Sequence, residues 1–562
     1  MKSFPLRIYL FALILRLIPV LLTRALGIGL DDMFQYDMLA RSMSSGNGYR
    51  WYAQEDLKLL EPYVNFDLST AKGYDPQYGL YTSFRAPLYP AFLAVIYFFN
   101  GLDFSRFFAA RLAQVILLGA PLAPLTYYVA TSYLKNASLS GSEGALPSKA
   151  RDSSVATPAL PLSFASGTIV AGGARENAPS ERHGILGMSF NQFSISERSE
   201  NIAKISAYIV ACYPMLLAYP LGLGTENLFF LLLLSSFLFL LKSIENSSAF
   251  HLLLSGLFLG LTALTRSVIL PFAGLAILFL IVIARSGATK QSPSWNQGLL
   301  RRGNHPPRND GIIIGIAFVL VITPWVIRNS LLHDKLTGIE TSMGYNLYLG
   351  YHPNGNGSFM FGPSLDLLTI MDDAERDEVG TQKAIGFMIE QPERFVPLAI
   401  NRLGFFFGLE TRVLMYFYSN NLIGYISKPL LLIISAILLL PFVFVSVSAC
   451  LGLSLLKWNS QTALLLLLLT FYLLPHVFIL AEDRFHLALI PFFAILAMQF
   501  WAVGFQAISA RWHESNAGKW VVTLAVLGVF LLFLNWGFEL SRDADKIAAL
   551  LGQDGNKTYY PY

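Results

Sequence analysis

Two adjacent carboxylates, Asp31 and Asp32, follow the first hydrophobic segment of the chain, which runs from Pro5 to Leu26. Like charges repel, and each is costly to remove from water, so a pair at a membrane boundary is expected to serve a purpose. A carboxylate whose pKa is raised by a neighbouring charge and by partial desolvation can accept a proton from a hydroxyl, an amine or a phosphate. The alternative is that one or both acids cap a helix over residues 33–44.

Four arginines stand at similar boundaries between apolar runs and polar loops: Arg85, Arg266, Arg328 and Arg484. A guanidinium group binds phosphate through a planar fork of donors and keeps its charge at physiological pH. Each arginine alone is also explained by a side chain that reaches toward lipid head groups. Together with the acid pair, the four arginines predict a site for a phosphate-bearing lipid substrate. Glu226, at the start of another apolar run, could orient an arginine, hold a metal ion or cap a helix.

The composition is that of a polytopic membrane protein. Hydrophobic residues make up 54% and charged residues 14%, the mean hydropathy is +0.51, and ordinary soluble domains are about 25% charged. The net charge of +4 is spread over short loops, which argues against a nucleic-acid partner. The two cysteines, Cys212 and Cys450, lie in apolar runs and offer no disulfide framework.

Eleven transmembrane helices are predicted from apolar runs of suitable length, which gives an all-α polytopic bundle. The runs are 5–26, 107–134, 202–223, 227–241, two within 252–284, 312–327, 429–455, 461–480, 487–508 and 520–537. The run 252–284 is too long for one helix and contains Arg266 and Pro271, so we divide it into two short helices that meet at the outer face. The first run contains Arg16 and lacks a small-residue cleavage site, so it is read as a retained span.

The basic loops predict the orientation in the cell membrane. Residues 285–311 carry five Lys or Arg residues and one acid, and the positive-inside rule places them in the cytoplasm with the N-terminus. The span count agrees only if Pro87–Phe99, which contains Pro87 and Pro90, lies at the membrane surface or is re-entrant. The acid pair, Glu226 and the four arginines then lie on the extracytoplasmic side.

Six regions follow from this map. They are 1–134 with the first outer loop, a disordered cytoplasmic insertion at 135–201, spans within 202–285, a second insertion at 286–311, a span and large outer loop at 312–428, and the C-terminal spans and short tail at 429–562. The insertions are rich in Ser, Ala, Gly and Pro and show no sustained periodicity. A charged amphipathic stretch from Asp372 to Pro397 is expected to lie along the membrane surface.

The sequence gives little support for nucleotide hydrolysis or zinc-dependent proteolysis. The sequence has no Walker loop, HExxH, GxSxG or paired CxxC motif, and its eight histidines are scattered. Energy for a reaction must then arrive in an activated substrate. A polyprenyl-phosphate sugar meets this need, because nucleotide sugars are made in the cytosol and the acid pair faces away from it.

The order of several short motifs resembles the GT-C glycosyltransferases, in particular the branch of the dolichyl-phosphate-mannose protein mannosyltransferases and the bacterial aminoarabinose transferases of lipid A. The motifs are Asp32 with Tyr36, Ala40 and Arg41; Arg85 before Tyr89 and Pro90; Thr225 with Glu226; Gly260 to Arg266; Pro324 to Asn329; Gly344, Tyr345 and Asn346; and Arg484 with Phe485 before Pro491. The chain departs from the family in its Asp-Asp pair, where Asp-Glu is usual, and in its short tail, where a soluble domain is absent.

The resemblance implies a GT-C-type bundle with amphipathic helices at the outer face. It also implies transfer of a sugar, with one inversion, from a polyprenyl-phosphate donor to a lipid, glycan or protein acceptor. Asp32 or Asp31 is then the base, and the four arginines hold the donor phosphate. Substrate binding or orientation falls to Tyr36, Tyr89, Glu226, Asn329, Tyr345 and Asn346.

Several alternatives stay open. A transporter or lipid flippase would also place charge in a membrane, but it predicts inverted repeats that are not clear in this sequence. A third possibility is a non-catalytic membrane subunit or sensor. The sequence leaves the sugar, the acceptor, the oligomeric state and any requirement for a divalent metal undecided.

Overall fold

The chain folds as a helical bundle with polar elements at one end. The computed structural model describes residues 3–139, 195–289 and 309–559, apart from positions 65, 67, 69, 70, 72 and 247. Within these residues the regular structure is helical except for one short antiparallel pair, β1 (Arg50–Trp51) and β2 (Leu80–Tyr81). The predicted all-α polytopic class is confirmed.

Eight helical segments in the described part of the chain are long and apolar enough to cross a membrane. They are α1 (Phe4–Leu22); Ser105–Lys135, built from α5 (Ser105–Ala113), η2 (Gln114–Gly119) and most of α6 (Leu122–Leu139); α9 (Thr225–Glu245); α12 (Asp310–Leu332); α18 (Lys428–Leu453); α19 (Ser460–Phe478); η7 (Phe485–Leu489) with α20 (Ile490–Glu514); and α21 (Asn516–Arg542). A ninth is bent by 54° and combines α7 (Ile195–Cys212), α8 (Pro214–Ala218) and η4 (Tyr219–Leu221).

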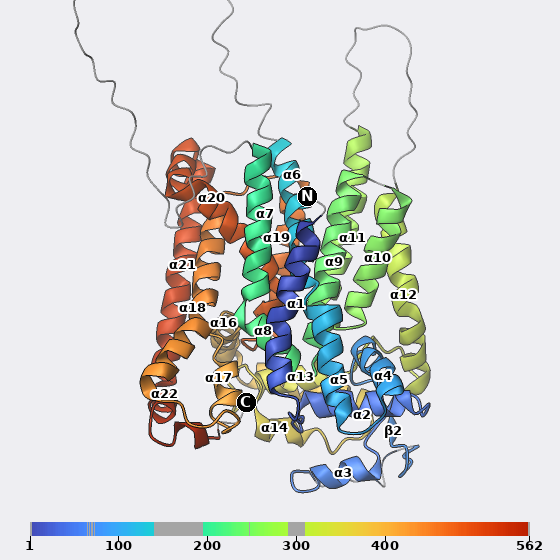
Figure 1. Ribbon diagram of the computed structural model, residues 1–562. Coiled ribbons are helices and arrows are strands. Elements are labelled where there is room, and N and C mark those ends of the chain that lie inside the picture. The colour runs from blue at the N-terminus through green and yellow to red at the C-terminus, as the bar shows by residue number, and fades with distance from the viewer. Residues whose placement is uncertain are drawn as a thin grey trace, which may run out of the picture.

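Two shorter apolar helices occupy the run 252–284, which was predicted to form two of the eleven spans. α10 (Ala249–Ala263) and α11 (Leu270–Thr289) stand beside α9 and α12 in the bundle (Figure 1). Arg266 has an extended backbone, and η5 (Ser267–Ile269) leads into α11, whose second residue is Pro271. Proline is tolerated in the first turn of a helix, where its missing N–H costs nothing. The predicted division of the 252–284 run is confirmed.

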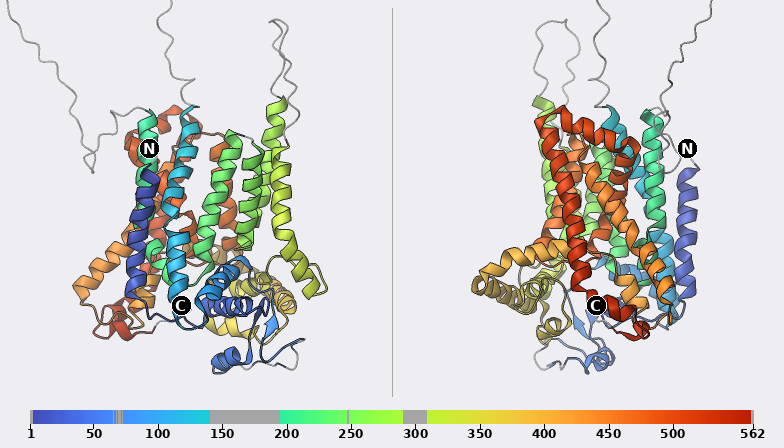
Figure 2. Two further views of the ribbon diagram at one scale, coloured as in Figure 1. Left: turned by 45° about the vertical axis from the view of Figure 1, so that its right-hand side comes forward. Right: turned by 90° about the vertical axis from the view of Figure 1, so that its left-hand side faces the viewer.

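The helix ends separate into two faces. The start of α1 lies at the upper end of the bundle, as do the end of α6, the start of α7, the end of α11 and the start of α12 (Figure 1). The first outer segment, including α2 (Asp32–Ser44), α3 (Gln54–Leu60) and α4 (Leu88–Asn100), lies at the lower end. Figure 2 shows the same separation from two other directions. We call the lower end the polar face.

Both predicted insertions are shorter than the sequence indicated. α6 continues to Leu139 and α7 begins at Ile195, so the ends of the 135–201 segment are helical. α11 continues to Thr289 and α12 begins at Asp310, which trims the 286–311 segment in the same way. Residues 140–194 and 290–308 lie outside the described residues, and the prediction of disorder there is not tested.

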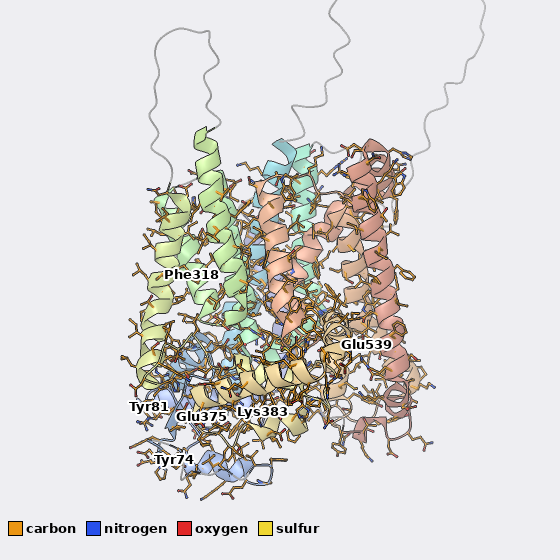
Figure 3. The ribbon with its side chains drawn as sticks, turned by 180° about the vertical axis from the view of Figure 1, so that it is seen from behind. Tyr74, Tyr81, Phe318, Glu375, Lys383 and Glu539 are labelled. Carbon is orange, nitrogen blue, oxygen red and sulfur yellow. The ribbon has the colours of Figure 1, made fainter. Side chains whose placement is uncertain are left out.

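The large loop between α12 and α18 folds into helices at the polar face. They are α13 (Met343–Tyr351), α14 (Phe361–Asp366), α15 (Asp373–Glu390), η6 (Pro392–Arg394), α16 (Phe395–Phe406) and α17 (Arg412–Phe417). α15 runs across the lower end of the bundle, with Glu375 and Lys383 along it (Figure 3). The predicted amphipathic stretch 372–397 is therefore two helices, because α15 ends before Pro392 and α16 begins after it. Past α21, the C-terminal residues form α22 (Ala544–Leu550) and η8 (Gly555–Lys557).

Glycines allow α10 and α12 to pack closely. A Cβ atom at Gly256 would lie 2.4 Å from the carbonyl oxygen of Ile314, and one at Gly260 would lie 2.7 Å from the Val321 side chain. These two glycines are four residues apart and share one face of α10. The contact fixes the position of α12, whose C-terminal end leads into the polar face.

Candidate active site

The acid pair opens α2 with two different roles. Asp31 is the N-cap of α2, and its Oδ1 accepts a hydrogen bond from the amide of Met33 at 2.8 Å. This confirms the capping alternative for Asp31. Loss of hydration and the adjacent Asp32 charge raise the pKa of Asp31.

Asp32 lies between two arginines from distant parts of the chain. Its Oδ1 forms a short ion pair with Arg85, and its Oδ2 lies 3.3 Å from Nη2 of Arg484. Burial would raise the pKa of Asp32, but Arg85, Arg484 and Arg266 together lower it to about 2. The carboxylate of Asp32 is therefore charged, and its side chain is 35% exposed.

Arg484 joins this pair to the starts of other helices. It lies between α19 and η7, with Nε 2.9 Å from Glu482 and 3.7 Å from Glu226. Glu226, in the first turn of α9, pairs with Nη1 of Arg266 at 2.7 Å. Helix ends and breaks thus bring side chains from α2, α9, the α10–α11 junction and η7 to one place.

Sequence reasoning missed several members of this site. Gln35 accepts a hydrogen bond from Nε of Arg85 at 2.8 Å. Arg412, the first residue of α17, pairs with Glu482 at 2.8 Å and with Asp483 at 3.1 Å. The two acids could have been found from their place directly before Arg484, whereas nothing local marks Arg412.

We use the name ion-pair cluster for the eight charged residues joined by these contacts. Its members are Asp32, Arg85, Glu226, Arg266, Arg412, Glu482, Asp483 and Arg484. Four carboxylates balance four guanidinium groups. An anionic ligand therefore competes with these carboxylates for the arginines that it binds.

Arg328 and Asn329 have other partners. Arg328 donates to the carbonyl oxygen of Thr82 at 2.6 Å, and its guanidinium lies 4.9 Å from the centre of the Trp325 ring. Asn329 is fully buried and donates to the carbonyl oxygens of Gly338 and Ile339 at 2.9 and 3.0 Å. Within the described residues neither has a recorded contact to the ion-pair cluster, and both tie the end of α12 to neighbouring loops.

Two of the predicted tyrosines, Tyr36 and Tyr89, pack against each other, and Tyr36 lies beside Arg85. Tyr36 is buried, and its ring centre lies 5.5 Å from the Arg85 guanidinium carbon. Burial raises the pKa of Tyr36 to about 12, so its phenol stays protonated. Tyr89 packs edge-on against Tyr36 with ring centres 5.2 Å apart, and its hydroxyl donates to Gln114 at 2.6 Å. Tyr89 therefore supports Tyr36.

α13 contributes Tyr345 and Asn346. The hydroxyl of Tyr345 donates to the carbonyl oxygen of Ser364 at 2.9 Å, and its ring packs edge-on against Phe84, the neighbour of Arg85. Burial raises the pKa of Tyr345 to about 12. The backbone amide of Asn346 donates to the carbonyl oxygen of Ser342 at 3.0 Å. Tyr345 thus lies close to the site, and the contacts of Asn346 are those of a helix residue.

Metal ligands are not grouped together in the part of the chain that the structure describes. Among the described residues, no group of three or more His, Cys, Asp or Glu side chains is placed to hold a metal ion. The carboxylate oxygens of Glu226 and Glu482 face arginines. Of the three roles considered for Glu226, the contacts favour orienting Arg266 and Arg484.

Comparison with known proteins gives limited similarity. The chain resembles a crystal structure described as ArnT from Cupriavidus metallidurans bound to undecaprenyl phosphate, with a TM-score of 0.33 and 11% sequence identity over 90% of this chain and 79% of the other. No family model matches the sequence, and no curated protein matches it.

Proposed function

We propose that this chain is an integral-membrane glycosyltransferase that moves a sugar from a polyprenyl-phosphate donor to a lipid, glycan or protein acceptor. The observation that carries the proposal is the placement of Asp32, a partly exposed acid held directly between Arg85 and Arg484. The candidate phosphate-binding groups and the candidate base therefore lie in direct contact at the polar face. The motif order in the sequence supports the same reaction class.

Donor binding begins with an exchange of partners. The donor phosphate binds the guanidinium groups of Arg85, Arg484 and Arg266 in place of the carboxylates that hold them, because its two non-bridging oxygens accept hydrogen bonds from a guanidinium fork as a carboxylate does. Asp32 then loses the positive charges that keep its pKa at about 2. Its basicity rises when the donor is in place, which prepares it for proton transfer.

Sugar transfer follows as one displacement. The acceptor nucleophile attacks the anomeric carbon while Asp32 takes the nucleophile's proton, and the bond from the anomeric carbon to the phosphate oxygen breaks. Polyprenyl phosphate leaves with the bonding electrons. A phosphate leaving group is weakly basic and is stabilised by the arginines, so a separate general acid is not needed. One displacement inverts the configuration at the anomeric carbon.

Asp31, Arg328 and the tyrosines receive supporting roles in this proposal. Asp31 fixes the start of α2 through its cap, and Arg328 fixes the loop before Arg85 through Thr82. Tyr36 packs beside Arg85, and Tyr345 packs on Phe84 with its hydroxyl bonded to Ser364. In this proposal Tyr36 can donate a hydrogen bond to the sugar or the phosphate, and Tyr345 can do so once its bond to Ser364 is released. Asn346 has no assigned role beyond its helix.

The orientation is also part of the proposal. α11 ends and α12 begins at the upper end of the bundle, opposite the polar face (Figure 1), and in the sequence the basic residues of 285–311 lie between or at these two ends. By the positive-inside rule this upper end faces the cytoplasm of a cell membrane, and the ion-pair cluster faces the extracytoplasmic side.

The test uses the purified full-length chain with a panel of labelled polyprenyl-phosphate sugars and an extract of membrane lipids, glycans and proteins. Transfer of label together with release of polyprenyl phosphate supports the proposal. The matched control is Asp32→Asn. Absence of any transfer contradicts it, and movement of the labelled lipid across a vesicle membrane without bond cleavage favours a flippase.

A further inference from the structure

Asp373, in the first turn of α15, holds a segment that is distant in sequence. Its Oδ2 accepts hydrogen bonds from the hydroxyl of Thr82 at 2.5 Å and from the amide of Ser83 at 2.8 Å. Thr82 and Ser83 are fully buried, and Asp373 is 2% exposed. These two residues stand directly before Phe84 and Arg85.

A buried arginine completes the contact. Arg376, one turn further along α15, pairs with the other oxygen of Asp373 and is 1% exposed. Its guanidinium carbon lies 4.7 Å from the centre of the Phe84 ring. The guanidinium carbon of Arg85 lies 5.0 Å from the same ring. The Phe84 ring therefore connects the buried pair of α15 to the arginine that holds Asp32.

Other groups also restrain this segment directly, including Arg328, which donates to the carbonyl oxygen of Thr82 at 2.6 Å. Ser83 Oγ lies 2.7 Å from Nε2 of His333 and 3.0 Å from the hydroxyl of Thr341. The hydroxyl of Tyr49 donates to the carbonyl oxygen of Arg85 at 2.9 Å. With both faces restrained, the backbone of 82–85 has little freedom, and Arg85 is presented from a fixed base.

Stability alone gives a weak reason for a buried charged pair at this place. Removing two charges from water costs several kcal/mol, and apolar residues of similar volume often serve the fold as well. A buried pair whose hydrogen bonds are directional fixes geometry instead. Asp373 belongs to no contact of the ion-pair cluster itself, so its effect on that cluster passes through the 82–85 segment.

We propose that Asp373 is a positioning residue that holds Arg85 in place for the donor phosphate, an inference that rests on the proposed function of Arg85. α15 then does more than cover the polar face, since its first turn sets the geometry of phosphate recognition. The ligand class is a phosphate monoester or diester carried by a lipid.

The experiment compares three variants of the full-length protein. Asp373→Asn keeps the side-chain volume and removes the charge. Thr82→Val removes one hydrogen bond at nearly constant shape, and it carries the test if Asp373→Asn does not fold. Glu375→Gln is the matched control, because Glu375 lies in the same helical turn and is exposed (Figure 3). The measurements are amide hydrogen exchange of residues 82–86, the dissociation constant for a polyprenyl phosphate in mixed micelles, and KM and kcat for the labelled donor.

The expected result is local. Both variants should speed amide hydrogen exchange at residues 82–86. They should also raise the donor KM and the dissociation constant for polyprenyl phosphate about tenfold, with a much smaller change in kcat. The control variant should show none of these changes. Unchanged exchange in both variants overturns the inference, as does a loss of protection spread evenly over the polar face. A fall in kcat at constant KM also overturns it. If the wild type neither binds polyprenyl phosphate nor transfers sugar, the proposed function fails, and exchange at 82–86 alone decides whether Asp373 holds the segment.

Discussion

Nη2 of Arg484 lies 3.3 Å from Oδ2 of Asp32, although 452 positions separate the two residues in the chain. Asp32 comes from the first helix after the first span, and Arg484 precedes the penultimate span. The contact closes the bundle at its polar face. It also makes the donor phosphate a competitor of Asp32 for one guanidinium group.

Substitution of Asp32 should lower transfer activity far more than substitution of Asp31. Asp32→Asn removes the proposed base and should lower transfer by about 10²- to 10⁴-fold, the usual contribution of a positioned general base. Asp31→Asn keeps a side-chain oxygen that can cap α2, so it should retain most activity and stability. Transfer rates measured at saturating donor decide between them. Equal activity in both variants, or a loss confined to Asp31→Asn, would show that the base is assigned wrongly.

Arg484→Lys should impair donor binding more than Arg328→Lys does. Lysine keeps the positive charge of Arg484 but cannot reach Asp32, Glu226 and Glu482 with a planar fork, so kcat/KM for the donor should fall about ten- to 100-fold. Arg328→Lys loses a hydrogen bond to Thr82, so it should lower the thermal stability and raise the donor KM less than Arg484→Lys does. A larger donor KM effect at Arg328 would place that residue back among the phosphate ligands.

The pH dependence of activity should differ between the free and donor-bound protein. In the free protein the pKa of Asp32 is about 2, so kcat/KM should stay level as the pH falls toward 4. With the donor bound, the arginines turn to the phosphate and the Asp32 pKa rises, so the acid limb of kcat should lie at higher pH than that of kcat/KM. Initial rates across a pH series, with Asp31→Asn as a control, test this order. Coincident acid limbs would argue against release of Asp32 by the donor.

Acid should also weaken the fold through Asp32. Its folded-state pKa is lowered from 3.8 to about 2, so its stabilising contribution is complete above the unfolded value and is lost as the pH falls from about 4 to about 2. The thermal stability of the wild type should therefore drop more steeply than that of Asp32→Asn over this window. Parallel curves for the two proteins would show that the ion pairs of Asp32 add little to stability.

Because α10 packs closely on α12, substitution of Gly256 should destabilise the protein far more than substitution of Gly274. A Cβ atom at Gly256 would lie 2.4 Å from the Ile314 carbonyl oxygen, so Gly256→Ala should destabilise the protein by about 1–3 kcal/mol. Gly274, in α11, has nothing within 4 Å of where a Cβ atom would stand, and Gly274→Ala should be neutral or slightly stabilising because alanine is the better helix former. Thermal unfolding in one detergent compares them. A Gly274→Ala variant as unstable as Gly256→Ala would contradict this packing.

Local features of the sequence predicted the fold correctly. Apolar length marks a span because a bilayer demands it, and the run 252–284 is longer than one span needs, so a break was expected near Arg266 and Pro271. The placement of acids and arginines at one face followed from counting spans. These rules depend only on neighbours in the sequence and on the membrane.

Tertiary structure decided which charges meet. Asp31 and Asp32 are the same residue type and are adjacent in the sequence. The extended backbone of Asp31 makes it the helix cap, and Asp32 faces Arg85 and Arg484. Arg328 and Arg484 were alike in sequence and on the same predicted side, but α12 carries Arg328 to the Thr82 carbonyl. No local sequence motif around Arg412 indicated that it belongs to the ion-pair cluster. The membrane fixes the depth of a side chain, whereas its partner depends on how helices distant in sequence rotate and pack, and no local pattern encodes that.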